Sequence, residues 1–214
     1  MTTQHFDHQD ILNLEQRYRA NLINGIGGYK PAALIGTCTA DGRTNLAIFN
    51  SIIHIGAHPP LIGFLLRPTT VARHTYNNIK QTGFYTINHV SKTMTERAHY
   101  TAAKFNEDQS EFEYCNLAAS YLDEFKAPYV DESVIKIGVS YHAEVPVEAN
   151  GTLLIIGKIE HIYAPKSALA DNGNVYLCEA ESMVTTGLDA YSLPSFVATY
   201  PYPRPAELPD FTKK

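Results

Sequence analysis

Two pairs of β-forming segments, each joined by a short turn, constrain the fold of this chain more than any other feature. The segments "AALIGTCT" (32–39) and "TNLAIF" (44–49) flank "ADGR", which contains the Asp-Gly dipeptide typical of a tight hairpin turn. Further along, "VIKIGVSYHAEVPVE" (134–148) and "TLLIIGKIEHIYA" (152–164) flank "ANG", a second hairpin signal. Because hairpins join antiparallel neighbours, the sequence favours an antiparallel sheet over a doubly wound parallel one.

Further strands are expected between and within these hairpins. The run "LIGFLL" (61–66) has no polar side chain, which fits a strand buried on both faces, and "FYTINHV" (84–90) is another strand. The segment "HIGAHPP" (54–60) is expected to be a loop, because a glycine and two adjacent prolines interrupt any regular ladder. Pro146 is expected at a sheet edge or a β-bulge.

A few short helices complete the expected elements. Apolar residues at steps of three and four predict an amphipathic helix over about residues 8–24. Either Thr69 or Thr70 can cap another helix, which ends near Gly83. Residues 91–105 are expected to be helical and mostly exposed to solvent.

The organisation is that of one domain. The run "NEDQSEFE" (106–113) is interpreted as a solvated acidic loop and not as a cluster of catalytic carboxylates. Nothing repeats, and no Pro/Ser-rich linker divides the chain. We therefore predict a single domain over residues 1–214, mainly β with short helices (α+β), whose strands form a closed or partly closed barrel, with an extended C-terminal tail over about 187–214.

The composition excludes several classes of partner. Lysine and arginine together number 17 against 22 acidic residues, a net charge of −5, so nucleic acid and anionic membranes are not expected partners. The three cysteines are far apart, no apolar run approaches the ~20 residues of a membrane span, and no signal peptide is recognisable; we expect a cytoplasmic protein. His54 and His58 lie four residues apart without a helix or a third ligand, so no metal site is expected.

Cations and hydroxyl groups are concentrated in "RPTTVARHTYNNI" (67–79), where a strand ends and a helix begins. The N–H groups at a helix N-terminus, together with its dipole, favour a bound anion, and arginines clamp phosphate oxygens. The alternative is that a threonine merely caps the helix while the arginines are solvated. The residues concerned are Arg67, Thr69, Thr70, Arg73, His74 and Thr75.

A second polar feature follows the first hairpin. Asn50 and Ser51 interrupt the otherwise apolar run "LAIFNSIIHI". Such side chains often satisfy nearby backbone groups, and that is the alternative to a binding role here. The two polar segments taken together favour a ligand site more than either does alone.

Four segments in this order resemble the flavin reductase-like FMN-binding split-barrel proteins. They are "KPAALIGTCTADGRTNLAIFNS", "HPPLIGFLLRPTTVARHTYNNIKQTGFYTINHV", "LLIIGKIEHI" and "TGLDAYSLPSFVATYPYPRP". The resemblance extends from about Lys30 to Pro205. It implies a six-stranded antiparallel split barrel, which is usually a homodimer that holds FMN near the subunit interface.

The resemblance also assigns residues to the flavin. Asn45, Leu46 and Ala47 match one segment of the family's site, and Phe49, Asn50 and Ser51 match the segment that borders the isoalloxazine ring and ribityl chain. The anion segment matches the phosphate-binding stretch. Its matching residues are Arg67, Thr69, Thr70, Arg73 and Thr75.

The flavin carries the redox chemistry, so no catalytic side chain is required. The leading hypothesis is an FMN-dependent oxidoreductase that takes hydride from NADH or NADPH and passes electrons to free flavin or another small-molecule acceptor. One alternative is a flavoredoxin-like electron carrier reduced by a partner protein, and another is a split barrel that has lost its cofactor. The C-terminal segment is longer than is common in family members that reduce free flavin, so the electron donor and the electron acceptor are not assigned.

The same resemblance and the many apolar strand residues both favour a homodimer. The apolar strands supply more surface than one small barrel readily encloses. Tyr200 and Tyr202, between prolines in "ATYPYPRP", are expected to cover a flavin or a neighbouring subunit, the alternative being surface packing.

Overall fold

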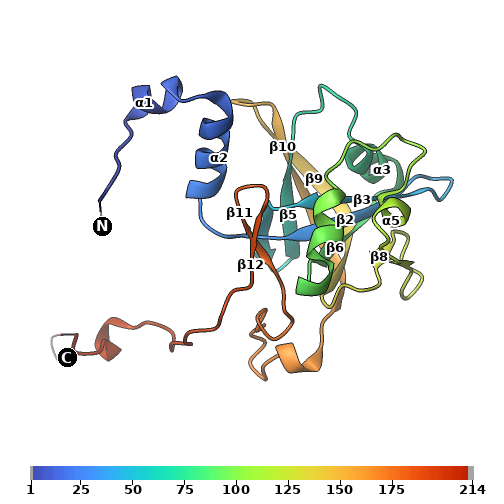
Figure 1. Cartoon of the computed structure of the whole chain (residues 1–214). Coiled ribbons are helices and arrows are strands. Elements are labelled where there is room, and N and C mark those ends of the chain that lie inside the picture. The colour runs from blue at the N-terminus through green and yellow to red at the C-terminus, as the bar shows by residue number, and fades with distance from the viewer. Residues whose placement is uncertain (1, 212–214) are drawn as a thin grey trace.

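A seven-stranded antiparallel sheet forms the body of the protein (Figure 1). The computed structural model describes residues 2–211. The strand order across the sheet is β3-β2-β6-β9-β10-β5-β4. The strands are β2 (Ala33–Cys38), β3 (Thr44–Phe49), β4 (Ile52–Ala57), β5 (Pro60–Leu66), β6 (Phe84–His89), β9 (Lys136–Val147) and β10 (Thr152–Tyr163).

Both predicted hairpins are present. In the first, β2 pairs with β3 from Ala33 opposite Phe49 to Cys38 opposite Thr44. In the second, the two twelve-residue strands β9 and β10 pair along their length with two register shifts. Pro146 lies in the part of β9 that has β10 as its only strand partner, so its prediction as an edge residue is confirmed.

The sheet is curled, because its two edge strands are consecutive in the chain. β3 and β4 stand at opposite ends of the strand order, yet only Asn50 and Ser51 connect them. Ser51 also contacts β5 through Leu65, whose backbone N–H donates to the Ser51 carbonyl at 3.3 Å. The fold class predicted from the sequence is confirmed, with seven strands in the large sheet where six were expected.

Side chains of β2 alternate between two apolar clusters, as the twofold period of a strand requires. Leu34 belongs to the cluster that contains Met94, Ala98 and Phe112. Ile35 belongs to the other, which collects side chains from strands across the sheet. Its fully buried members are Ile35, Phe64, Ile79, Tyr85, Ile87, Val139 and Ile155.

Within residues 2–211, five short α-helices accompany the sheet: α1 (His8–Asn13), α2 (Gln16–Ile26), α3 (His74–Thr82), α4 (Thr95–Tyr100) and α5 (Glu111–Tyr114). Helix α3 contributes Ile79 to the second cluster, whereas α4 and α5 contribute Ala98 and Phe112 to the first. The described part of the chain also contains three 3₁₀ turns: η1 (Lys92–Met94), η2 (Lys166–Ala168) and η3 (Pro205–Glu207).

Two small sheets carry the remaining strands. β1 (Lys30–Pro31) pairs with β11 (Val184–Thr186), which pairs with β12 (Ala190–Ser192), and β7 (Ala119–Ser120) pairs with β8 (Tyr129–Val130). The β11–β12 hairpin thereby joins the C-terminal part of the chain to the segment that precedes β2.

The predicted N-terminal helix over 8–24 is wrong in one respect, because it is two helices. Glu15 is the N-cap of α2, and its carboxylate accepts hydrogen bonds from the backbone N–H groups of Arg17 and Tyr18, both at 2.9 Å. A capping carboxylate satisfies the N–H groups that the first turn of a helix exposes, so a second helix begins directly after Glu15. Neither helix has a buried residue, and Figure 1 shows α1 and the C-terminal segment extending away from the sheet.

The predicted loop over 54–60 is also wrong. Residues 52–57 form β4, and β5 begins at Pro60, so the segment is a hairpin. Glycine and proline are compatible with this hairpin because of where they lie. The register of the β4–β5 pairing shifts between His54 and Gly56, and Pro59 lies in the turn.

Burial differs from expectation at two further segments. Leu65 is 37% exposed, so β5 is not buried on both faces. The helix predicted over 91–105 is shorter, ending with α4 at Tyr100, and it is not mostly solvent-facing, since Met94 and Ala98 are completely buried. By contrast, Gly83 ends α3 as predicted, in the left-handed conformation at φ 77°.

Candidate functional site

An amide–hydroxyl contact joins two of the segments that the resemblance assigns to the flavin, through Asn45 and Thr75. The Asn45 side chain, 8% exposed, donates hydrogen bonds to Thr37 Oγ1 and Thr75 Oγ1, both at 3.2 Å. Asn45 belongs to β3, whereas Thr75 is the second residue of α3. Residues 30 positions apart in sequence are thus neighbours, and the N-terminus of α3 is fixed beside β3.

The N-terminus of α3 has no side-chain cap. The helix begins at His74 with Arg73 as its extended N-cap residue, and no side chain accepts a hydrogen bond from its first turn. The prediction that Thr69 or Thr70 caps this helix is therefore wrong; both are exposed in the turn that precedes it. Because no side chain caps α3, the N–H groups of its first turn are available for an anion.

Two arginines flank this helix terminus in different ways. Arg73 is held by a hydrogen bond from its Nε to the Pro68 carbonyl at 3.2 Å. Arg67 follows β5 and is exposed, and it has neither a hydrogen bond nor an ion pair to any residue between 2 and 211. The donor set at this point, free backbone N–H groups and a guanidinium without a carboxylate, fits a phosphate.

The residues between β3 and β4 make hydrogen bonds to backbone groups far away in sequence. Asn50 donates from its side-chain amide to the Gly187 carbonyl at 2.9 Å. Ser51 Oγ donates to the Leu65 carbonyl at 3.0 Å and accepts from the Leu65 N–H at 3.2 Å. Both side chains thus bond to backbone groups, as the alternative to a binding role expects, but these backbone groups are distant in sequence.

Ala47 and Phe49 are half-buried and lie on the same side of β3 as Asn45, because residues two apart share a face of a strand. The Phe49 ring packs edge-on against Phe64, with ring centroids 5.0 Å apart. The face of β3 that leads from the α3 terminus to Asn50 therefore carries one amide, one methyl group and one aromatic ring.

Leu46 points the other way. Its side chain is completely buried in the cluster beneath α4 and α5, and its backbone N–H donates to a carboxylate oxygen of Glu111 at 2.8 Å. This N–H is already used within the chain, so Leu46 belongs to the structural support of β3 here.

Glu111 is a residue that the sequence interpretation missed. The prediction of a solvated acidic loop over 106–113 is wrong at this residue, because Glu111 begins helix α5 and is only 5% exposed. Burial raises the pKa of its carboxyl group, against the lowering effect of the Leu46 hydrogen bond and of nearby His74. Phe112 and Cys115, both buried and three residues apart, are the pattern that indicates this amphipathic turn.

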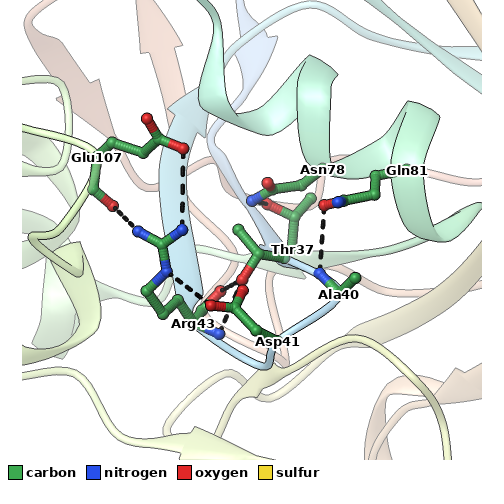
Figure 2. A network of polar contacts seen from close by, with 8 residues as sticks. Thr37, Ala40, Asp41, Arg43, Asn78, Gln81 and Glu107 are labelled. Atoms are coloured by element: carbon green, nitrogen blue, oxygen red, sulfur yellow. Dashed lines mark hydrogen bonds and ion pairs between the residues drawn. The ribbon is translucent and has the colours of Figure 1, made fainter.

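A groove with a volume of about 560 Å³ lies between α3 and the β2–β3 turn. Figure 2 shows the polar contacts of Arg43, Asn78 and Gln81, which line it. Arg43 in its wall is paired with Asp41 at 3.3 Å and with Glu107 at 3.9 Å. Gln81 accepts a hydrogen bond from the Ala40 N–H at 3.2 Å. The lining residues are Thr39, Asp41, Arg43, Tyr76, Asn77, Asn78, Lys80, Gln81 and Glu107.

Within residues 2–211, no group of three or more His, Cys, Asp or Glu side chains is placed to hold a metal ion. Over the same range, no helix combines the length and apolarity that crossing a membrane requires.

Comparison with known proteins identifies the family. The flavin reductase like domain matches residues 29–179, which is most of the chain. The chain belongs to this family. A protein of Shewanella frigidimarina NCIMB 400, described as a flavin reductase with a split barrel domain, has a similar structure with a TM-score of 0.90 and 42% identity, over 94% of this chain and 100% of that one.

Two more distant structures share the fold. Nitrilotriacetate monooxygenase component B of Bacillus cereus is 16% identical with a TM-score of 0.79, over 94% of this chain and all of that chain. The flavoredoxin of Desulfovibrio vulgaris (Miyazaki F) is 24% identical with a TM-score of 0.69, over 80% of this chain and 90% of that chain. The split-barrel fold and a flavin-related oxidoreductase family are thus established.

Proposed function

We propose that this protein is an FMN-dependent oxidoreductase that takes hydride from NADH or NADPH and passes electrons to a small acceptor. The observation that carries the proposal is the uncapped N-terminus of α3, fixed to β3 by the Asn45–Thr75 hydrogen bond. This arrangement supplies a phosphate site next to a half-buried strand face that ends in Phe49 and Asn50.

Each group has a separate role in the proposal. The N–H groups of the first turn of α3 and the guanidinium of Arg67 bind the phosphate, and Arg73 orients the preceding turn through Pro68. Phe49 and Ala47 contact the ring system, and Asn50 and Ser51 fix the link between β3 and β4. Bound FMN would accept a hydride at its ring system and release electrons one or two at a time.

The remaining residues of the proposed site have three roles. Thr75 holds Asn45, while Thr69 and Thr70 are exposed hydroxyls beside the phosphate position. Leu46 supports the strand from the opposite face.

Titration with FMN and riboflavin tests the phosphate site. Each charge-assisted hydrogen bond contributes about 1.5–3 kcal/mol, so FMN should bind at least about tenfold more tightly than riboflavin. Arg67→Ala should weaken FMN binding about tenfold and leave riboflavin binding unchanged, whereas Arg17→Ala on α2 is a matched control that changes neither. Equal affinities for the two flavins would overturn the phosphate assignment.

Anaerobic mixing tests the donor. Rapid bleaching of bound FMN by NADH or NADPH supports the oxidoreductase. Reduction only by a protein donor supports instead a carrier of the flavoredoxin kind. Purified protein that takes up no FMN would indicate a split barrel without a cofactor.

We further propose that two copies of this single domain associate. The tail exposes several large apolar side chains, among them Val197, Tyr200, Tyr202 and Phe211, at 79–87% of their surface. The outer faces of β4 and β5 add Ile53 and Leu65. A second copy that covers these surfaces would also cover the β3–β4 link, where the flavin is proposed to lie.

A further inference from the structure

The β11–β12 hairpin reaches the link between β3 and β4, although the two lie far apart in sequence. Asn50, in this link, donates from its side-chain amide to the Gly187 carbonyl at 2.9 Å, across 137 positions. Gly187 is the first residue of the turn over 187–189 that joins β11 to β12, and its φ of 67° lies in the left-handed region that favours glycine. This turn therefore lies beside the end of β3 where the ring system of the flavin is proposed.

The two strands of the hairpin are anchored to the body of the protein. β11 pairs with β1, with Thr185 opposite Lys30. Tyr191 of β12 packs against the apolar cluster that contains Leu46, and its hydroxyl forms a 3.0 Å hydrogen bond with Nδ1 of His99 on α4. Because both strands are anchored, the turn between them is held in place beside the β3–β4 link.

The turn presents one apolar and one acidic side chain to its surroundings. Leu188 exposes 44% of its surface, and Asp189, the next residue, is also exposed. Asp189 has no ion pair with any residue between 2 and 211. A carboxylate without a cation repels other anions, and at physiological salt this repulsion acts over a Debye length of ~8 Å.

The two ends of the proposed flavin site thus differ in charge. At the phosphate end lie Arg67 and the N-terminus of α3, which a bound phosphate would neutralise. At the ring end, the turn over 187–189 contributes the carboxylate of Asp189 and no cation. A molecule that approaches the ring end is therefore favoured when it is apolar and carries no negative charge.

We propose that the turn of the β11–β12 hairpin borders the position of the electron acceptor and selects uncharged, apolar acceptors over anionic ones. The inference rests on the proposed function, which places the ring system beside Phe49 and Asn50. Leu188 offers apolar contact, and Asp189 disfavours a negative charge on the acceptor. A quinone belongs to the favoured class: it takes two electrons and two protons from the reduced flavin and becomes the hydroquinone, while the flavin returns to its oxidised form.

Reoxidation of the FMN-loaded full chain by two matched quinones tests the proposal. 1,4-Naphthoquinone and 1,4-naphthoquinone-2-sulfonate share a ring system and differ by one negative charge. Bound FMN is first reduced anaerobically by light and EDTA, so the reaction with the acceptor is measured in the dark without a nicotinamide donor. The measured quantity is the ratio of the second-order rate constants, uncharged quinone over anionic quinone.

Asp189→Asn should lower this ratio about three- to tenfold relative to wild type, because it removes the repulsion of the anionic quinone. About 0.5 M NaCl should remove most of the difference between the two proteins, since salt screens the charge. Leu188→Ala should slow reoxidation by both quinones and leave their ratio unchanged. Asp171→Asn is the matched control, because Asp171 is an exposed carboxylate in a different turn, and it should not change the ratio.

The possible outcomes separate this inference from the proposed function. If Asp189→Asn leaves the ratio unchanged, or if Asp171→Asn changes it equally, the inference is overturned while FMN binding stands. If the ratio shifts as expected but neither NADH nor NADPH reduces bound FMN, the inference holds and only the proposed donor is wrong. If the wild-type protein takes up no FMN, the proposed function fails and this inference fails with it. Uptake of FMN by each variant shows that the variant is folded.

Discussion

Replacing Glu111 with alanine removes the acceptor for the Leu46 N–H and leaves this buried donor on β3 without a partner. An unsatisfied buried N–H costs about 1–3 kcal/mol of the free energy of unfolding. For a chain of this size, each kcal/mol corresponds to a fall of about 2–4 °C in Tm. Glu111→Ala should therefore lower Tm by roughly 2–12 °C in thermal unfolding followed by circular dichroism.

Glu113→Ala is the matched control, because Glu113 lies on the same helix and is exposed. It should change Tm by less than about 2 °C, as surface substitutions do. Equal losses in the two variants would refute the argument that the Glu111 carboxylate supports the edge of β3.

The pH dependence gives a second readout for the same residue. Because burial raises the pKa of Glu111 in the folded state, folding disfavours its ionised form. Its contribution to stability is thus greatest below the ordinary pKa of 4.5 and declines as pH rises through the folded-state value. Wild type should gain stability relative to Glu111→Gln, which does not titrate, as pH falls from 7 toward 4.5. A difference that is constant with pH would contradict the raised pKa.

Three further outcomes are expected. Gly157→Ala should lower the free energy of unfolding in urea by about 1–3 kcal/mol or more, because a Cβ at this position would overlap Tyr85 Oη and Val139, whereas Gly27→Ala meets open space and should have little effect. Asn45→Ala should cost about 1–3 kcal/mol and also weaken FMN binding, since it releases Thr75 from β3; unchanged FMN affinity would separate Asn45 from the site. Sedimentation at micromolar concentration should give about twice the chain mass of 23.8 kDa, and a monomer that binds FMN tightly would contradict the proposed dimer.

Local turn chemistry made much of the fold predictable. The Asp41-Gly42 turn, with Gly42 at φ 89°, and the left-handed Gly83 are requirements of the backbone itself, so both appeared where the sequence placed them. The segment 32–39 was expected to be a strand, which the structure confirms as β2, and β2 is buried on both of its faces.

The errors arose where tertiary contacts override local patterns. Gly56 and Pro59 break strands in general, but a hairpin accommodates them at a register shift and a turn. Glu111 belongs to an acidic run that looks solvated in sequence. Its carboxylate is nevertheless buried, because the backbone N–H of Leu46 on the edge strand β3 needs a hydrogen-bond acceptor. Likewise, neither Thr69 nor Thr70 reveals in sequence that the helix starts four residues later at His74.

The two-residue link between β3 and β4 has a mechanical consequence. Three peptide units separate Phe49 from Ile52, so these residues can never be more than about 11 Å apart, however the sheet moves. The edge strands β3 and β4 are therefore held close together at the end where this link joins them. Any separation of β3 from β4 has to begin at their other ends, at Thr44 and Ala57, while Phe49 and Ile52 stay close together.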